Sequence, residues 1–398
     1  MRLLLIMLLL PSACLSLLAA DAIFDVQSII DTPLNPKVLT RSEKDGIVTE
    51  EVMFHSEMDG KKSVDIFAYF CYPKGAKKLP AFIWNQAGLG KASTYFPELG
   101  AKRGYAVLCI DNPMPGYRST GGYGVSLDLK GDPKQNGIYH TAVALLKAVS
   151  YLRSRPEVDK NRIGMAGSSW GGFFTTLMAG IDPRLKAASA MFGCGSLQLG
   201  NGWWSEPKNT EADKAYREHW RTTLDPAWRL PKSKVPIGWF TGANDQFYWM
   251  PALMSSYAMA GGPKHLTLMP NYNHGLPPEL DDQVFAWLDV YLRKKPPFIT
   301  VSPVSVVKRN GKPYARWTFT AVKERPVTNA ELILSYGESG NWVGRKWETL
   351  PAKIAGQQCE VELPDNPQTC YIGGAIVDQQ QYRYSTPLLR VNLKELGR

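Results

Sequence analysis

After residue 20 the sequence lacks any apolar run close to the roughly 20 residues that a membrane-spanning helix requires. It also lacks long blocks of one charge, because the formal net charge of +10 is spread along 398 residues. We therefore expect no membrane span and no nucleic-acid partner, while attraction to an acidic polysaccharide stays open. Internal repeats and low-complexity tracts are missing as well, which favours ordinary globular domains.

The amino-terminal segment is the one long apolar stretch. Met1-Arg2 is followed by an apolar run over residues 3–10 and then by small residues that end at Ala19-Ala20. This pattern is typical of a secretory signal peptide, here residues 1–22, with cleavage after Ala20 or Ala22. We therefore expect an exported protein, either secreted or periplasmic.

Cysteine is scarce, with six residues in the whole sequence and five after the predicted signal peptide. Cys71 and Cys109 lie within apolar strand-like runs, where a free thiol is an ordinary core residue. Cys359 and Cys370 lie on two β-like runs that a Pro-Asp-Asn-Pro turn separates. A disulfide that closes a hairpin and a pair of free thiols are both compatible with this spacing in an oxidising compartment.

The length and a hydrophobic content of 44% favour two packed domains. From about residue 47 to 297, short β-like runs alternate with helical patterns, so we expect a domain over residues 23–297 with a mostly parallel sheet and helices on both faces. After Pro296-Pro297 the pattern changes to alternating runs, so we expect a β-sandwich over residues 298–398. Buried strands are expected at residues 80–84, 105–110, 162–165, 186–192, 235–240 and 265–269, after an antiparallel pair at 47–54 and 63–72, with helices at 138–152 and 283–292.

The most informative motif is Gly167-Ser168-Ser169-Trp170-Gly171, which stands between a predicted strand and a helix-compatible segment at residues 173–179. A G-x-S-x-G motif in this context places its serine on a strained turn, and the residues two before and two after it must be small. Centring the turn on Ser168 would put the large Trp170 at one of these positions. The motif therefore predicts Ser169 as a nucleophile.

A serine nucleophile needs a positioned base, and in this kind of fold the acid and then the histidine follow the serine in the chain. Asp245 comes just after the predicted strand 235–240, although such a residue can also be a simple turn aspartate. His274 lies in a loop after the strand 265–269. The sequence has only five histidines, and the other four precede the acid or lie within a strand. We therefore predict His274 as the base and Asp245 as the acid that orients it.

Hydrolysis also requires donors that stabilise the oxyanion of the tetrahedral intermediate. The backbone N–H of Trp170, directly after the serine, is the first expected donor. The second is expected from the Gly-rich segment after the strand 80–84, at the N–H of Gln86 or Ala87, although this segment could also be only a turn. Neither a metal nor a cofactor is expected for this chemistry.

An aromatic-rich insert, residues 193–231, precedes the strand that leads to the acid. Insertions at this point often cover the active site. Trp203 and Trp204 of the insert, with Phe247 and Tyr248 after the acid, are candidates for a wall that stacks on a sugar ring or an aryl group. The alternative is that the tryptophans form the small core of the insert itself.

The segment 162–192, with its Gly-Ser-Ser-Trp-Gly-Gly elbow, resembles the same region of the prolyl oligopeptidase family, and residues 47–295 resemble a wider group with dienelactone hydrolases and acetyl xylan esterases. The resemblance implies an α/β-hydrolase fold and the triad Ser169, Asp245 and His274. This sequence departs from the group in its Asn-Gln-Ala-Gly oxyanion segment and in the sandwich that follows. We do not expect the β-propeller that precedes the hydrolase domain in the family's peptidases.

These features favour an exported serine hydrolase of carboxylic esters, above all an acetyl esterase whose partner is a small-molecule or carbohydrate ester. A prolyl-oligopeptidase-like peptidase or amidase is the alternative, with Glu206, Glu211 or Glu218 available to hold a substrate amino terminus. A lipase or thioesterase would need a long apolar groove. A non-catalytic carbohydrate-binding scaffold would need a broken triad, and all three residue types are present in order.

Overall fold

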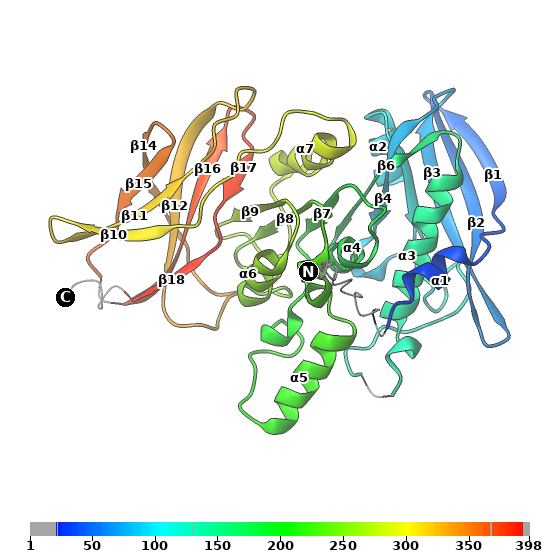
Figure 1. The fold of residues 1–398 in the computed structure, drawn as a ribbon, viewed down its shortest axis with the longest axis horizontal. Coiled ribbons are helices and arrows are strands. Elements are labelled where there is room, and N and C mark those ends of the chain that lie inside the picture. The colour runs from blue at the N-terminus through cyan, green and yellow to red at the C-terminus, as the bar shows by residue number, and fades with distance from the viewer. Residues whose placement is uncertain (1–20, 22, 130, 367, 393–398) are drawn as a thin grey trace, which may run out of the picture.

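The computed structural model describes residue 21 and residues 23–129, 131–366 and 368–392, which form an α/β domain with a β-sandwich beside it (Figure 1). Apart from Asp21, the predicted signal peptide lies outside these residues. The predicted fold class is confirmed, because a mostly parallel sheet with helices is followed by antiparallel sheets.

A nine-stranded sheet forms the centre of the α/β domain. It is antiparallel over its first strands and parallel from β5 to β9, as the sequence pattern predicts. The first strand was not predicted, because all of its residues are exposed and it has no buried alternation. In spatial order the strands are β1 (Lys37–Lys44), β2 (Ile47–Asp59), β3 (Lys62–Pro73), β5 (Ala106–Ile110), β4 (Leu79–Asn85), β6 (Val158–Ser168), β7 (Ala188–Met191), β8 (Ile237–Gly242) and β9 (Lys264–Met269).

Helices cover both faces of this sheet, so successive side chains of a strand enter different cores. In β4, Phe82 joins the core under α2 and α7, while Ile83 joins the core under α3, α4 and α6. None of the helices in the described part of the chain is both long and apolar enough to cross a bilayer. The helices are α1 (Val26–Asp31), α2 (Tyr95–Lys102), α3 (Gly137–Ser154), α4 (Trp170–Ile181), α5 (Glu211–Thr223), α6 (Met250–Met259) and α7 (Asp281–Leu292).

The sandwich consists of two antiparallel sheets that pack around a buried tryptophan, Trp317. Its indole lies against Gly374 of the opposite sheet, where a Cβ would come within 2.6 Å of the ring. Glycine at this position therefore lets the two sheets approach each other. The first sheet contains β10 (Ser305–Arg309), β11 (Lys312–Thr318), β15 (Gln358–Glu362) and β14 (Lys353–Ala355); the second contains β13 (Glu348–Pro351), β12 (Val327–Tyr336), β16 (Thr369–Asp378), β17 (Arg383–Ser385) and β18 (Leu389–Asn392).

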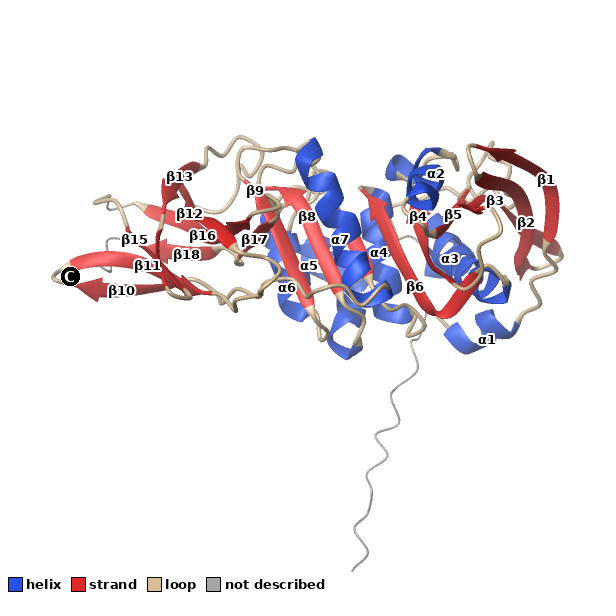
Figure 2. Cartoon of the chain, turned by 90° about the horizontal axis from the view of Figure 1, so that it is seen from above, coloured by secondary structure: helices blue, strands red, loops and turns tan. Residues whose placement is uncertain are grey.

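The sandwich covers the edge of the central sheet at β9, at the opposite end from β1 (Figure 2). Ser385 accepts a hydrogen bond from Leu268 N at 3.0 Å, and Arg383 Nε donates to Leu268 O at 2.8 Å. Thr267 Oγ1 donates to Arg383 O at 3.0 Å. These contacts satisfy backbone groups that an uncovered edge strand would leave unpaired.

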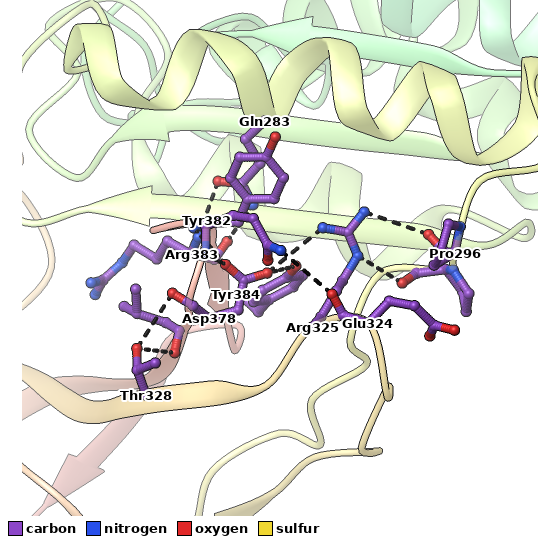
Figure 3. Close-up of polar contacts among 12 residues, drawn as sticks. Gln283, Pro296, Glu324, Arg325, Thr328, Asp378, Tyr382, Arg383 and Tyr384 are labelled. Carbon is purple, nitrogen blue, oxygen red and sulfur yellow. Dashed lines mark hydrogen bonds and ion pairs between the residues drawn. The ribbon is translucent and has the colours of Figure 1, made fainter.

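The junction continues beyond β9 through buried polar contacts (Figure 3). Gln283 of α7 donates to Arg383 O at 2.7 Å and accepts from Arg383 N at 3.1 Å. Arg325 donates to Pro297 O at 3.0 Å, and within the sandwich Tyr384 donates to Asp378 at 2.7 Å. The two domains thus share a hydrogen-bonded interface and not only a linker.

The hairpin disulfide considered for Cys359 and Cys370 is not formed, and all five cysteines of the described residues are free thiols. Cys359 lies on β15 in one sheet of the sandwich, where it pairs with Trp317, and Cys370 lies on β16 in the other sheet, where it pairs with Tyr336. Residues 363–366 therefore belong to a connection between the two sheets and not to a hairpin turn. The prediction of a hairpin was wrong, because a turn sequence does not show whether the strands on its two sides pair with each other.

Candidate active site

The predicted catalytic and oxyanion residues follow the carboxyl ends of four parallel strands, β4, β6, β8 and β9, with β7 lying between β6 and β8. Parallel strands end at the same edge of a sheet, and ligands of such sheets bind there. Ser169 follows β6, Asp245 follows β8 and His274 follows β9, while Gln86 and Ala87 follow β4. The topology therefore brings together segments that are far apart in the sequence.

Ser169 occupies the strained position of the turn between β6 and α4. Its φ of 57° and ψ of −120° lie outside the regions that non-glycine residues normally adopt. Ser168, by contrast, is the last residue of β6 and does not share this positive φ. The turn is crowded, because a Cβ on Gly167 would lie 2.6 Å from Asn85 Cβ, and one on Gly171 would lie 2.2 Å from Asn85 O. Small residues on both sides of Ser169 are thus required sterically.

A continuous hydrogen-bonded chain joins Ser169, His274 and Asp245. His274 Nε2 lies 2.8 Å from Ser169 Oγ, and His274 Nδ1 lies 2.8 Å from Asp245 Oδ2. Because an ionised carboxylate only accepts hydrogen bonds, Nδ1 of the neutral ring carries the proton. Nε2 is then free to accept the proton of the Ser169 hydroxyl. This is the geometry that a nucleophile, its base and the orienting acid require.

The carboxylate of Asp245 is fully buried and held by the backbone that follows it. Its Oδ1 accepts hydrogen bonds from Phe247 N at 2.8 Å and from Tyr248 N at 2.9 Å. The other oxygen, Oδ2, faces His274. Since hydrogen bonds fix both oxygens, the carboxylate cannot rotate away from the imidazole, and its negative charge favours the imidazolium that forms when His274 takes a proton.

Asn273 links the loop of the acid to the loop of the histidine. Its Oδ1 accepts hydrogen bonds from Gln246 N at 2.9 Å and from His274 N at 2.8 Å. The histidine loop also touches Gly242, the last residue of β8, where a Cβ would lie 2.0 Å from Tyr272 O. The sequence reasoning did not assign a role to Asn273, although the asparagine-rich segment Pro-Asn-Tyr-Asn-His before and including the histidine was a usable signal.

The segments predicted to supply oxyanion donors lie against each other. Trp170 begins α4, so its backbone N–H belongs to the first turn, where helices have no internal acceptors and the helix dipole favours negative charge. Asn85, directly before Gln86, packs against Gly171 of the same turn. The structure thus places Gln86 and Ala87 in the segment that adjoins the elbow.

Asp111, which the sequence reasoning missed, anchors the far end of that segment. It is fully buried after β5 and accepts hydrogen bonds from the backbone N–H of Ala92 and, at 3.0 Å, of Arg118. The side chain of Gln86 is used within the segment, where Nε2 donates to Ser93 Oγ at 2.8 Å. A carboxylate directly after a buried strand was the available signal for Asp111.

Two of the four predicted substrate residues lie beside the triad. The ring of Phe247 lies 4.8 Å from that of His274, and the ring of Trp203 stacks on Phe247 at 5.3 Å. Trp203 also contacts Trp170, the residue after Ser169, at 5.4 Å. Both Trp203 and Phe247 are only partly buried, so part of each ring is accessible.

The other two predicted substrate residues are placed differently. Trp204 turns toward α5 and packs edge-on against Tyr216 at 5.4 Å and Trp220 at 5.0 Å, so it belongs to the core of the insert. Tyr248 is only 2% exposed and lies beneath His274 in the main core. Both side chains therefore serve as core residues in this structure, and their contact with a substrate stays a prediction. Sequence does not show to which side a loop side chain turns.

Among the described residues, no group of three or more histidine, cysteine, aspartate or glutamate side chains is placed to hold a metal ion. Two of the acidic residues considered for a peptide clamp are paired on the surface of α5. Glu211 accepts from Lys214 at 2.9 Å, and Glu218 pairs with Arg221. Neither pair contacts the triad residues.

Residues 93–295 match the prolyl oligopeptidase family. The chain belongs to this family. The match contains Ser169, Asp245 and His274, and the resemblance predicted from the elbow is confirmed. As a family member of the α/β-hydrolase group, the chain is a serine hydrolase.

Curated relatives include α/β hydrolase gkaG of Penicillium citrinum, 28% identical over 253 residues, which cover 56% of this chain and 56% of that protein. Dipeptidyl-peptidase 5 of Porphyromonas gingivalis is 26% identical over 249 residues, which cover 55% of this chain and 34% of that protein. The matches thus span about half, or less, of the length of these relatives.

Among solved structures, the acetyl xylan esterase from Paenibacillus sp. R4 is similar in fold, with a TM-score of 0.58 and 20% identity over 67% of this chain and 92% of that chain. Acetyl xylan esterase 1 from Thermoanaerobacterium sp. JW/SL YS485 has a TM-score of 0.56 and 17% identity over 66% of this chain and 91% of that chain. These likenesses concern the α/β fold.

Proposed function

We propose that the chain hydrolyses carboxylic esters, with Ser169 as nucleophile, His274 as general base and Asp245 as the residue that orients the base. The observation that carries the proposal is the chain of two 2.8 Å hydrogen bonds from Ser169 through His274 to Asp245. The strained backbone of Ser169 supports it, because such strain persists where it serves a function.

The reaction follows from this geometry. Ser169 Oγ attacks the ester carbonyl while His274 Nε2 takes its proton, and the N–H of Trp170 with that of Gln86 or Ala87 stabilises the oxyanion. The imidazolium then gives its proton to the leaving alcohol, and an acyl-enzyme forms on Ser169. A water molecule, deprotonated by His274, attacks this ester, and the carboxylic acid leaves as the proton returns to Ser169.

We further propose an acetyl ester of a carbohydrate as the substrate. Trp203 and Phe247 offer partly exposed, flat apolar rings next to His274, and such rings suit the apolar face of a sugar. The fold is shared with acetyl xylan esterases, which is consistent with this choice. The signal-like pattern of residues 1–22 supports export, which would bring the enzyme to polysaccharide outside the cell.

A peptidase is the second candidate, since two of the curated relatives are dipeptidyl-peptidases. An amide leaving group must be protonated as it departs, so it requires tighter positioning of the substrate than an ester does. Glu211 and Glu218, two of the acids considered for such positioning, form ion pairs within α5 instead. This pairing favours the ester.

The nucleophile is tested with the neighbouring serines as a matched pair. Ser169→Ala should lower the hydrolysis of a small aryl acetate by at least about a thousandfold, because the attacking oxygen is removed. Ser168→Ala, one residue earlier on β6, should retain most activity. Thermal unfolding of both variants verifies that the fold is kept. Full activity of Ser169→Ala would refute the proposed mechanism.

The substrate is tested by comparing acetylated xylo-oligosaccharides, a long-chain fatty ester and a prolyl peptide amide. We expect the acetylated sugar to have the highest kcat/KM. Trp203→Ala should lower that value about tenfold by removing a stacking surface, while a minimal aryl acetate is affected less. Trp204→Ala is the matched control, because its ring packs on Trp220 and should affect stability alone. Faster cleavage of the amide would overturn the esterase assignment and leave the triad standing.

A further inference from the structure

A loop of the sandwich reaches the two segments that carry the acid and the base. This loop, residues 337–347, connects β12 to β13, and we name it the brace loop. Asn244, directly before Asp245, donates from Nδ2 to Arg345 O at 2.5 Å and to Val343 O at 3.1 Å. The side chain of Asn244 is therefore bound to the backbone of the other domain.

The brace loop binds the histidine segment equally closely. Asn271 Nδ2 donates to Trp347 O at 2.7 Å, and Trp347 N donates to Asn271 Oδ1 at 2.9 Å. Asn271 has a φ of 56°, a left-handed conformation that asparagine tolerates better than most residues. It lies three residues before His274, so its position limits where the imidazole can lie.

Arg345 gives the brace loop its shape from within. Its guanidinium donates to Tyr336 O at 3.1 Å and to Gly340 O at 3.1 Å, and it also binds Glu338 O. The same group lies 4.6 Å from the ring centroid of Trp342. A side chain only 8% exposed that binds the last carbonyl of β12 and two carbonyls of the loop restricts the conformations of that loop.

We propose that the sandwich positions the catalytic acid and base through the brace loop, with Asn244 and Asn271 as its contacts and Arg345 as its internal support. The inference rests on the proposed roles of Ser169, His274 and Asp245. Loops lack the regular hydrogen bonding of strands, and a displacement of about 1 Å at a reacting group lowers rates about a hundredfold. The brace loop supplies the missing restraint.

The same interface contains two matched controls, Gln283 and Arg325 (Figure 3), whose hydrogen bonds go to residues outside the brace loop. Gln283 makes the same two bonds with Arg383 as Asn271 makes with Trp347, one as donor at 2.7 Å and one as acceptor at 3.1 Å. Arg325, like Arg345, is a buried arginine that donates to backbone carbonyls, in its case of Pro296 and Pro297. These residues join the domains away from the triad.

The experiment compares Arg345→Met with Arg325→Met, and Asn271→Gly with Gln283→Ala, in the full chain. Glycine keeps the left-handed backbone of residue 271 accessible. Four quantities are measured: the rate at which a fluorophosphonate labels Ser169, kcat and KM for an aryl acetate, and the midpoint of thermal unfolding. The phosphonate reports activation of the serine whatever the natural substrate is.

We expect Arg345→Met and Asn271→Gly to lower the labelling rate and kcat about 10- to 100-fold, with KM nearly unchanged. The controls should lose similar stability and keep both rates within about twofold. Equal losses of rate in all four variants, or an unchanged rate in the folded Arg345→Met and Asn271→Gly proteins, would overturn the inference. If one of these two does not fold, the other decides.

Failure of the proposed function gives a different result. A wild-type protein that is labelled at Ser169 but hydrolyses no ester overturns the esterase proposal, and the labelling rates of the variants still test the brace loop. A wild-type protein that is not labelled refutes Ser169 as an activated nucleophile, and the inference about the brace loop then falls with it.

Discussion

The tightest contact of the elbow predicts a severe effect from adding one methyl group. In Gly171→Ala the new Cβ would lie 2.2 Å from Asn85 O and 2.7 Å from Asn85 C. Ordinary contacts of a Cβ begin at about 3.4 Å, so the chain would have to move by about 1 Å. Both atoms belong to backbone, which cannot rotate aside as a side chain can.

The size of the effect follows from what must move. Overpacking of this kind costs about 1–3 kcal/mol of stability, and we expect the upper part of that range because neither partner is flexible. Separation of Asn85 from the turn would also displace the adjoining segment with Gln86 and Ala87 from Trp170. A shift of about 1 Å in an oxyanion donor should lower kcat about a hundredfold.

Gly275→Ala provides the control, because Gly275 directly follows His274 and yet has space around it for a methyl group. A Cβ at Gly275 would meet only the ring of Tyr272, at 3.6 Å, and its backbone φ is not in the left-handed range. Urea unfolding gives the stability of both variants, and aryl acetate hydrolysis gives kcat. Wild-type kinetics in a well-folded Gly171→Ala protein would refute the steric reasoning about the elbow.

Two further predictions concern the rest of the chain. Burial lowers the pKa of His265 to about 3, and nearby Arg325 adds to the effect. The folded protein therefore favours the neutral ring, and this contribution to stability is fully present at pH values above the ordinary pKa of about 6.5. That stability is lost as pH falls from about 6.5 toward 3. Between pH 7.5 and 5, the free energy of unfolding in urea should fall by about 2 kcal/mol more for the wild type than for His265→Gln. Equal losses in the two proteins would contradict this prediction. Burial also raises the pKa of Cys359 and Cys370 to about 11, so both should resist iodoacetamide at pH 8 in the folded protein. All five cysteines of the described residues should react after unfolding without reductant, and a pair that reacts only after reduction would show a disulfide instead.

Much of the α/β domain could be predicted because its signals are local. Buried strands appear as short apolar runs, and the elbow around Ser169 combines a strand, a fixed spacing of small residues and a helix within about 20 residues. Strand β1 gave no such signal, since all of its residues are exposed. The structure brings Ser169, Asp245 and His274 together, and their order along the chain was enough to choose them.

The remaining features depend on contacts that local sequence does not encode. Trp203 and Trp204 are adjacent and of one type, yet the first turns to the triad and the second to α5. Asn271 and Trp347 are 76 residues apart, and no pattern in either segment indicates that they meet. Cys359 and Cys370 show the opposite case: they are only eleven residues apart in the sequence, and yet they lie in different sheets.

The sandwich and the triad are connected by the way the central sheet ends. A parallel sheet places its active-site loops after the carboxyl ends of its strands, and here the last of these strands, β9, is also an edge. The histidine segment therefore has neighbouring strand loops on one side only. Residues 383–385 cover the edge of β9, and the brace loop covers the exposed side of the segment that follows it. A domain added at this edge thus has two effects. It forms hydrogen bonds with the edge strand β9, and it packs against the side of the His274 loop that no other strand loop covers.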